Sequence, residues 1–170
     1  MHNASIVNAV ACTGLQLYSF GETVSIPFWE ENWKPTSFFD KIIANLRNGL
    51  HTLCLLDIKV KEKSLEALMR GRDEYEKPRF MSASVAAQQL LVILNDKDQN
   101  AQHDEDSKLL TKESIVAALA RVGSDDQKIV SCTLDQMTGV DMGSPLHSLV
   151  IPGRMHPLEE EMLSTFRKQD

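Results

Sequence analysis

A chain of 170 residues is long enough for one domain with a sizeable core, or for one domain and part of a second. Its hydrophobic content of 42% and charged content of 25% are ordinary for a soluble globular protein, and its net charge of −6, without a basic stripe, argues against nucleic acid as a partner. No apolar run approaches the ~18 residues of a membrane span, and the N-terminus lacks the features of a secretory signal. Three widely separated cysteines predict reduced thiols in a cytosolic protein rather than a disulfide framework.

The first part of the chain predicts a helix and a strand. Asn3 or Ser5 can cap a helix whose apolar residues continue to Leu15. Residues 21–29 alternate polar and apolar side chains, which is typical of a strand, and Pro27 favours a place at the edge of a sheet.

A second helix and the most apolar strand of the chain follow. Thr36 or Ser37 caps the helix, and Gly49 ends it. Residues 51–60 contain four consecutive apolar residues, which predicts a strand buried on both faces in the middle of a sheet. Because ligands in open α/β sheets gather at the carboxyl ends of strands, the end of this strand at Leu56 is a candidate ligand site.

The middle of the chain is more polar. Ser64 is expected to begin a short helix, and the basic residues of segment 59–79 predict a solvated face. Ser82 is expected to cap a longer helix whose inner side is apolar up to Leu94. Residues 95–108 have no apolar period and predict a mobile loop.

The last part of the chain predicts strands and a closing helix. Residues 115–122 fit either a helix or a buried strand, but the turn at 123–126 and the β-like run over 127–133 favour a hairpin. The remaining expected elements are a short helix over 134–140, a strand over 146–151 and a final helix from Pro157 with Met162, Leu163 and Phe166 on its buried side.

This order of elements predicts an α/β sandwich around a mixed sheet. A search for local motifs finds no G-x-G-x-x-G, P-loop, H-E-x-x-H or G-x-S-x-G. No cysteine pair has metal-binding spacing, and His147 with His156 is a weak metal pair, so we expect no metal site. Cys54 lies in an apolar run and is expected to be inert, which argues against the hypothesis of an unrelated α/β protein with a cysteine nucleophile.

Six strings, in the right order along the chain, nonetheless resemble the diphthine synthase family, particularly its eukaryotic form. This family is one of the tetrapyrrole-methylase-like (class III) methyltransferases. The strings are HNASI (2–6), FGETVS (20–25), GLHTLCLLDIKVKE (49–62), AAQQLL (86–91), ARVGSDDQKI (120–129) and PLHSL (145–149).

The resemblance implies a methyltransferase with two α/β domains that binds S-adenosylmethionine in the cleft between them and releases S-adenosylhomocysteine. It implies that elongation factor 2 is the protein substrate, methylated on its modified histidine to give diphthine methyl ester in diphthamide biosynthesis. A cytoplasmic homodimer without nucleic-acid or membrane partners is expected. Residues 1–20 would be a helix and linker left from the N-terminal domain and the cleft, and residues 21–170 the C-terminal domain. The family's N-terminal domain, with its glycine-rich loop, is then absent from the chain.

The resemblance also implies five cofactor-binding residues: Ser5, Ile6, Leu56, Val122 and His147. The residues by themselves mark the helix start at Ser5 and the strand end at Leu56, give no signal for Val122, and indicate only a structural role for His147. The catalytic residues are unknown. No residue is required to act as a general base, because alignment of an amine with the sulfonium methyl can supply much of the rate by proximity. The alternative is a non-catalytic C-terminal domain that only dimerises or binds elongation factor 2.

Overall fold

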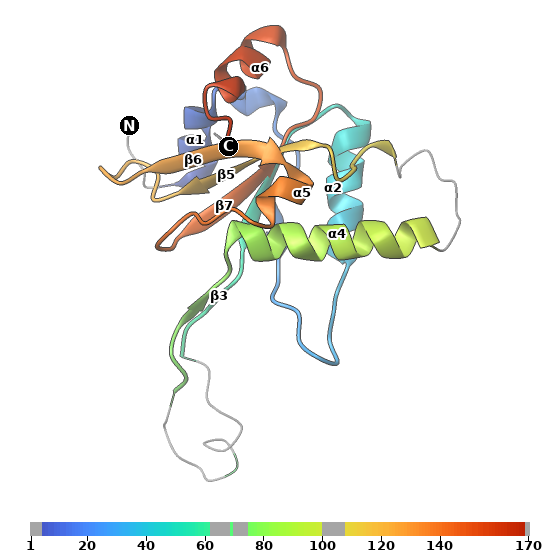
Figure 1. The fold of residues 1–170 in the computed structure, drawn as a ribbon, viewed down its shortest axis with the longest axis vertical. Coiled ribbons are helices and arrows are strands. Elements are labelled where there is room, and N and C mark those ends of the chain that lie inside the picture. Colours follow the sequence, from blue (N-terminus) through green and yellow to red (C-terminus); the bar gives the residue numbers. More distant parts are fainter. Residues whose placement is uncertain (1–4, 62–68, 70–74, 100–107, 169–170) are drawn as a thin grey trace.

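The computed structural model describes residues 5–61, 69, 75–99 and 108–168, and these form an α/β sandwich around a mixed sheet (Figure 1). The sheet has five strands in the order β1-β2-β7-β5-β6. Strands β1 and β2 are parallel, and every other neighbouring pair is antiparallel, which confirms the predicted mixed sheet. The strands are β1 (Val24–Ile26), β2 (Thr52–Leu56), β5 (Ile115–Ala120), β6 (Lys128–Thr133) and β7 (His147–Ile151).

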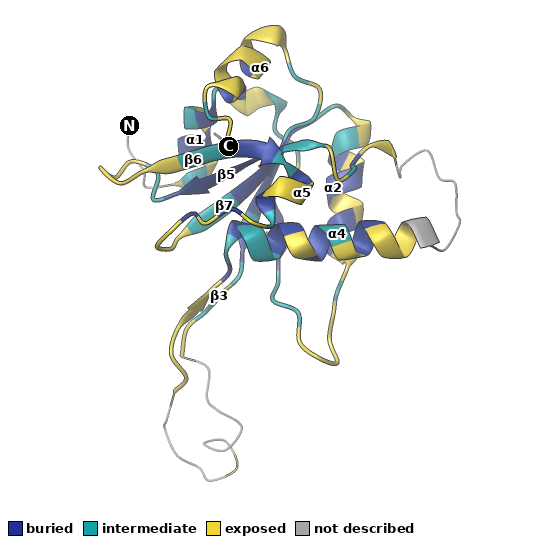
Figure 2. Ribbon diagram, in the orientation of Figure 1, coloured by how far each residue is buried: buried dark blue, intermediate teal, exposed yellow. Residues whose placement is uncertain are grey.

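Helices cover both faces of the sheet. One core joins it to α2 (Ser37–Arg47), α4 (Ala83–Gln99) and α5 (Leu134–Met137), and a second core joins the opposite face to α1 (Ile6–Ala9), the 3₁₀ helix η1 (Val10–Thr13) and α6 (Pro157–Ser164). A further 3₁₀ turn, η2 (Leu17–Ser19), leads toward β1. The sheet strands are largely buried, whereas the outer sides of the helices are exposed (Figure 2). None of the described helices is long and apolar enough to cross a membrane.

Strand β2 is buried on both faces, as its apolar run predicts. Leu53 belongs to the core under α1 and α6, whereas Cys54 belongs to the core under α2 and α4. The alternation follows from the two-residue period of a strand. The strand lies between β1 and β7, and β7 rather than β2 occupies the centre of the sheet.

The predicted strand over 51–60 divides at Asp57. The Asp57 carboxylate accepts a hydrogen bond of 3.0 Å from the Phe28 backbone N–H, and the Asp57 carbonyl accepts one of 3.0 Å from Met81. These bonds fix the end of β2. The chain then enters a separate antiparallel ribbon of β3 (Ile58–Lys59) and β4 (Arg79–Phe80) that projects from the sandwich (Figure 1).

The predicted N-terminal helix is wrong beyond Ala9. The chain tightens there into η1, where the Thr13 hydroxyl donates a 2.7 Å hydrogen bond to the Val10 carbonyl, and Gly14 ends it with a φ of 85°. Ser5 is the N-cap residue, but its side chain makes no capping hydrogen bond. Strand β1 is shorter than predicted and lies at the sheet edge, as Pro27 indicates.

Elsewhere the predicted elements are found with shifted ends. Helix α4 continues to Gln99, so the predicted loop over 95–108 begins too early. The predicted helix from Ser64 lies, except for Met69, outside the described residues. The hairpin of β5 and β6 is confirmed. Met162 is 42% exposed rather than buried, because the inner side of α6 consists of Glu159 and Leu163, which are one helical turn apart.

Candidate functional site

A pocket of 450 Å³ lies at the edge of the sheet where β2 and β5 end and β7 begins. Both β2 and β5 run antiparallel to β7, so their carboxyl ends meet at this edge. Helix α1, which covers the same face of the sheet as α6, contributes Ile6 and Ala9. The pocket therefore occupies the position that the end of β2 predicted for a ligand site.

Four of the five residues that the resemblance implies for cofactor binding line this pocket. Ile6 comes from α1, Leu56 from β2, Val122 from the turn after β5 and His147 from β7. The fifth residue, Ser5, is exposed and immediately precedes Ile6. Four distant segments of the chain thus meet in one cavity, while their role in cofactor binding stays a prediction.

The walls of the pocket are largely apolar. Leu55, Ile58 and Leu119 line it together with Leu146, which is half-exposed at the rim. Ala9, from α1, is buried in the wall of the pocket. Such walls favour a ligand that carries an apolar group.

Arg121 is a pocket residue that the sequence did not single out, although it belongs to the string ARVGSDDQKI. Its backbone is left-handed, with a φ of 50°. Its Nη1 donates a 2.9 Å hydrogen bond to the Met142 carbonyl and another to the Ser144 carbonyl, and its Nε lies 2.6 Å from the Asp126 carboxylate. Since these partners occupy the guanidinium, Arg121 shapes the pocket rim by holding the loop before β7.

His147 has hydrogen-bond partners at both ring nitrogens. Its Nε2 lies 3.0 Å from the Gly143 carbonyl and 3.1 Å from that of Ser144, and its Nδ1 lies 3.4 Å from the Ala83 backbone N–H at the start of α4. Because carbonyl oxygens accept and a backbone N–H donates, this pattern makes Nε2 the donor and Nδ1 the acceptor. The ring therefore links β7, α4 and the loop, so a ligand would meet its face or its backbone.

The other chemical groups considered from the sequence have structural surroundings. Among the residues the structure describes, no group of three His, Cys, Asp or Glu is placed to hold a metal ion. His156 caps α6, because its Nδ1 accepts a 3.2 Å hydrogen bond from Leu158. Cys54 is fully buried, and burial raises the pKa of its thiol to about 12, so the thiolate that a nucleophile requires is not formed at neutral pH.

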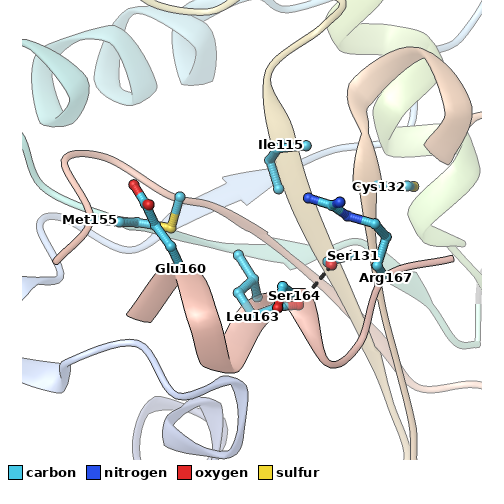
Figure 3. Close-up of a pocket in the computed structure, with 8 residues that line it drawn as sticks. All are labelled: Ile115, Ser131, Cys132, Met155, Glu160, Leu163, Ser164 and Arg167. Atoms are coloured by element: carbon cyan, nitrogen blue, oxygen red, sulfur yellow. Dashed lines mark hydrogen bonds between the residues drawn. The ribbon is translucent and has the colours of Figure 1, made fainter. Parts of the chain in front are cut away.

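A second pocket, of 240 Å³, lies between α6 and the hairpin of β5 and β6 (Figure 3). It is lined by Cys132, Glu160 and Arg167 among others, and the Ser131 hydroxyl donates a 2.9 Å hydrogen bond to the Leu163 carbonyl beside it. None of the predicted cofactor residues lines this pocket, and its volume is below the ~300 Å³ of ordinary small-molecule sites.

The comparisons with known proteins agree with the sequence strings. No family model matches the chain. The chain is 60% identical over 98% of its length to the diphthine methyl ester synthases of Bos taurus and of Homo sapiens, and it spans 57% of the length of each. The crystal structure of a "putative diphthine synthase" from Entamoeba histolytica superposes with a TM-score of 0.82 at 39% identity, covering 100% of this chain and 60% of that one. By sequence over nearly its whole length and by fold, this chain is similar to the diphthine synthases, and it spans a little over half the length of the relatives it matches.

Proposed function

We propose that this chain is the larger part of an S-adenosylmethionine-dependent methyltransferase of diphthamide biosynthesis, acting on the modified histidine of elongation factor 2. The observation that supports this best is the meeting of Ile6, Leu56, Val122 and His147 in one pocket. The names of the relatives support the same reaction class. In this proposal residues 21–170 are the C-terminal domain of a cytoplasmic homodimer, and residues 1–20 join that domain to the remainder of the enzyme.

The pocket suits the nucleoside half of the cofactor. Its volume of 450 Å³ lies within the roughly 300–1,000 Å³ of small-molecule sites, and Leu55, Leu56 and Leu146 offer apolar surfaces for a purine ring. No carboxylate lines the pocket among the described residues, and the Arg121 guanidinium is already occupied. The charged methionine half therefore has no partner of opposite charge here, and we expect it to lie beyond these walls.

The chemistry that the bound cofactor supplies is an electrophilic methyl group, which a neutral amine of the protein substrate can attack directly. This chain contributes position and shelter: the apolar side chains of Ile6 and Leu56 exclude water, and the loop held by Arg121 and His147 fixes the rim. We assign no general base, since alignment of the two reacting groups can account for much of the rate.

Calorimetric titration of S-adenosylhomocysteine into the chain tests this proposal. We expect a dissociation constant in the micromolar range, about −8 kcal/mol. Ile6→Glu places a carboxylate in the pocket wall and should weaken binding at least tenfold, about 1.4 kcal/mol. Val7→Glu is the matched control, because Val7 is the next residue of α1 and is 53% exposed. Equal weakening by both variants would contradict the assignment of the pocket.

The second candidate function is a non-catalytic module that binds elongation factor 2 or a second copy of the chain. It is supported by the exposed apolar side chains of Ile58, Val60 and Phe80, because clusters of such side chains are typical of interaction surfaces. A folded chain that binds elongation factor 2 but gives no heat with S-adenosylhomocysteine would support this candidate over the first.

A further inference from the structure

The ribbon that projects from the sandwich exposes four large apolar or aromatic side chains. We define the projecting ribbon as residues 58–61 and 75–80, which include β3 and β4. Val60 and Tyr75 are each 53% exposed, Ile58 is 44% exposed and Phe80 is 40% exposed. The ribbon stands clear of the body of the molecule and is mostly exposed (Figure 2). Clusters of exposed apolar side chains are typical of sites that bind a protein or a membrane.

The described part of the ribbon has little to stabilise it by itself. Two cross-strand pairs join it, Ile58 with Phe80 and Lys59 with Arg79. An isolated two-stranded ribbon is marginally stable in water, and like charges directly opposite each other destabilise it further. A partner that covers the apolar side chains and neutralises the charges would therefore add stability to this element.

The loop after β1 partly compensates the ribbon charges. The Lys59 ammonium donates a 2.8 Å hydrogen bond to the Glu30 carboxylate, and the Arg79 guanidinium lies 5.6 Å from the centre of the Phe28 ring. The hydrogen bond and charge of Lys59, and then the charge of Arg79, hold the pKa of Glu30 below its ordinary value. These contacts anchor the base of the ribbon to the sandwich, so that it presents its outer residues in a defined direction.

The ribbon as a whole is basic in an acidic protein. Lys61 and Lys77 add to Lys59 and Arg79, against one acidic residue, Glu76, whereas the whole chain has a net charge of −6. The segregation of positive charge onto one exposed element favours a negatively charged partner.

The ribbon also begins at the candidate ligand pocket. Ile58 is the first residue of β3 and lines the pocket, so the exposed surface leads outward from the pocket mouth. A macromolecule bound along the ribbon would thus have one end beside the ligand.

We propose that the projecting ribbon is a docking surface for the protein substrate, and that it binds an acidic segment of that substrate next to the residue to be methylated. This inference rests on the proposed function. A protein is favoured over a small molecule because the ribbon projects from the body of the molecule and offers Tyr75, Phe80 and Arg79, which are residue types enriched in protein interfaces. An anionic membrane would be attracted by the same charges and is an outcome of the test.

The test measures binding of purified elongation factor 2 to the whole chain by biolayer interferometry, at low and at high salt. The double variant Lys61→Glu/Lys77→Glu should weaken binding at least tenfold at low salt and less at high salt, because salt screens exposed charges. Phe80→Ser should weaken binding at both salt concentrations. The matched controls are Lys112→Glu and Leu158→Ser, which alter exposed residues away from the ribbon and should change binding less than twofold.

A parallel titration with S-adenosylhomocysteine separates the two proposals. Unchanged cofactor affinity in the ribbon variants, together with lost binding of elongation factor 2, supports the docking surface. Cofactor binding without binding of elongation factor 2 by the wild-type chain would overturn the docking proposal and leave the proposed pocket intact. Equal losses in the control variants would overturn it as well. Vesicles of phosphatidylserine and phosphatidylcholine serve as the membrane probe, and binding to them that the ribbon variants abolish, without binding to elongation factor 2, would replace the protein partner by a membrane.

Discussion

Replacing Glu159 by glutamine tests the buried polar network that joins the N-terminal segment to the sandwich. Glu159 is 3% exposed and accepts three hydrogen bonds. Its Oε1 accepts from the Gln16 backbone N–H at 2.7 Å and lies 3.1 Å from the His51 Nε2, and its Oε2 accepts from the His156 backbone N–H at 2.6 Å. His51 is itself fully buried, and its Nδ1 accepts a 2.9 Å hydrogen bond from the Gly153 N–H.

The size of the effect follows from these contacts. A glutamine oxygen can keep the two bonds of Oε1, but the amide NH₂ then faces the His156 N–H, and two donors oppose each other. Hydrogen bonds to a charged group contribute about 1.5–3 kcal/mol each, and a buried donor without an acceptor costs about 1–3 kcal/mol. We therefore expect Glu159→Gln to lower the free energy of unfolding by roughly 2–5 kcal/mol.

The control is Glu160→Gln, which removes the same charge from the same first turn of α6 at an exposed position. Loss of the favourable interaction with the helix dipole costs about 0.3–1 kcal/mol in either variant. Urea unfolding followed by circular dichroism at pH 7 measures both. A Glu159→Gln effect no larger than that of Glu160→Gln would refute the reasoning, because it would mean that the buried carboxylate adds nothing beyond its charge at the helix start.

The pH dependence of the same difference supplies an independent check. Burial alone would raise the pKa of Glu159, but the hydrogen bonds from His156, Gln16 and His51 outweigh it and hold the pKa below its ordinary value. A lowered folded-state pKa means that the contribution is fully present above the unfolded value of about 4.3 and is lost as the pH falls through the folded value. The gap between wild type and Glu159→Gln should therefore be constant near neutrality and shrink below about pH 4.3.

Three further predictions concern packing and reactivity. Gly153→Ala should lower the free energy of unfolding by about 1–3 kcal/mol, because a Cβ there would lie 2.4 Å from the Leu50 carbonyl oxygen. The control is Gly139→Ala, where the nearest atom to the added Cβ lies at 3.8 Å and the change should stay within about 0.5 kcal/mol. Urea unfolding measures both variants. Leu149→Ala removes a fully buried side chain from the central strand and should cost about 2.7–5 kcal/mol in the same assay, so a smaller loss would mean that the core collapses around the site. Iodoacetamide should label the half-buried Cys12 before Cys54 in the native chain, as mass spectrometry of peptides can show, and fast labelling of Cys54 would contradict its burial.

Local sequence patterns predicted much of the fold. The run over 53–56 fixed a strand buried on both faces because no amphipathic alternative suits four consecutive apolar residues. The turn at 123–126 identified the hairpin of β5 and β6, whose first strand is ambiguous by itself. The patterns were less accurate at element ends, as at Ala9 and Gln99, where individual hydrogen bonds and caps decide.

The sequence by itself also determined which strings resemble the family, and hence which residues to examine. Only the tertiary structure decided that Ile6, Leu56, Val122 and His147 share a cavity, because residues so far apart in the chain are brought together by strand order and direction, which local patterns do not encode.

Tertiary structure likewise decided the roles of Arg121, Glu159 and His51. Each of these side chains looks like an ordinary polar residue in the sequence. Their hydrogen bonds, in contrast, reach segments up to 143 residues away, as between Gln16 and Glu159. A buried charge or imidazole is tolerated only where several partners converge on it, and that convergence exists only once the chain has folded.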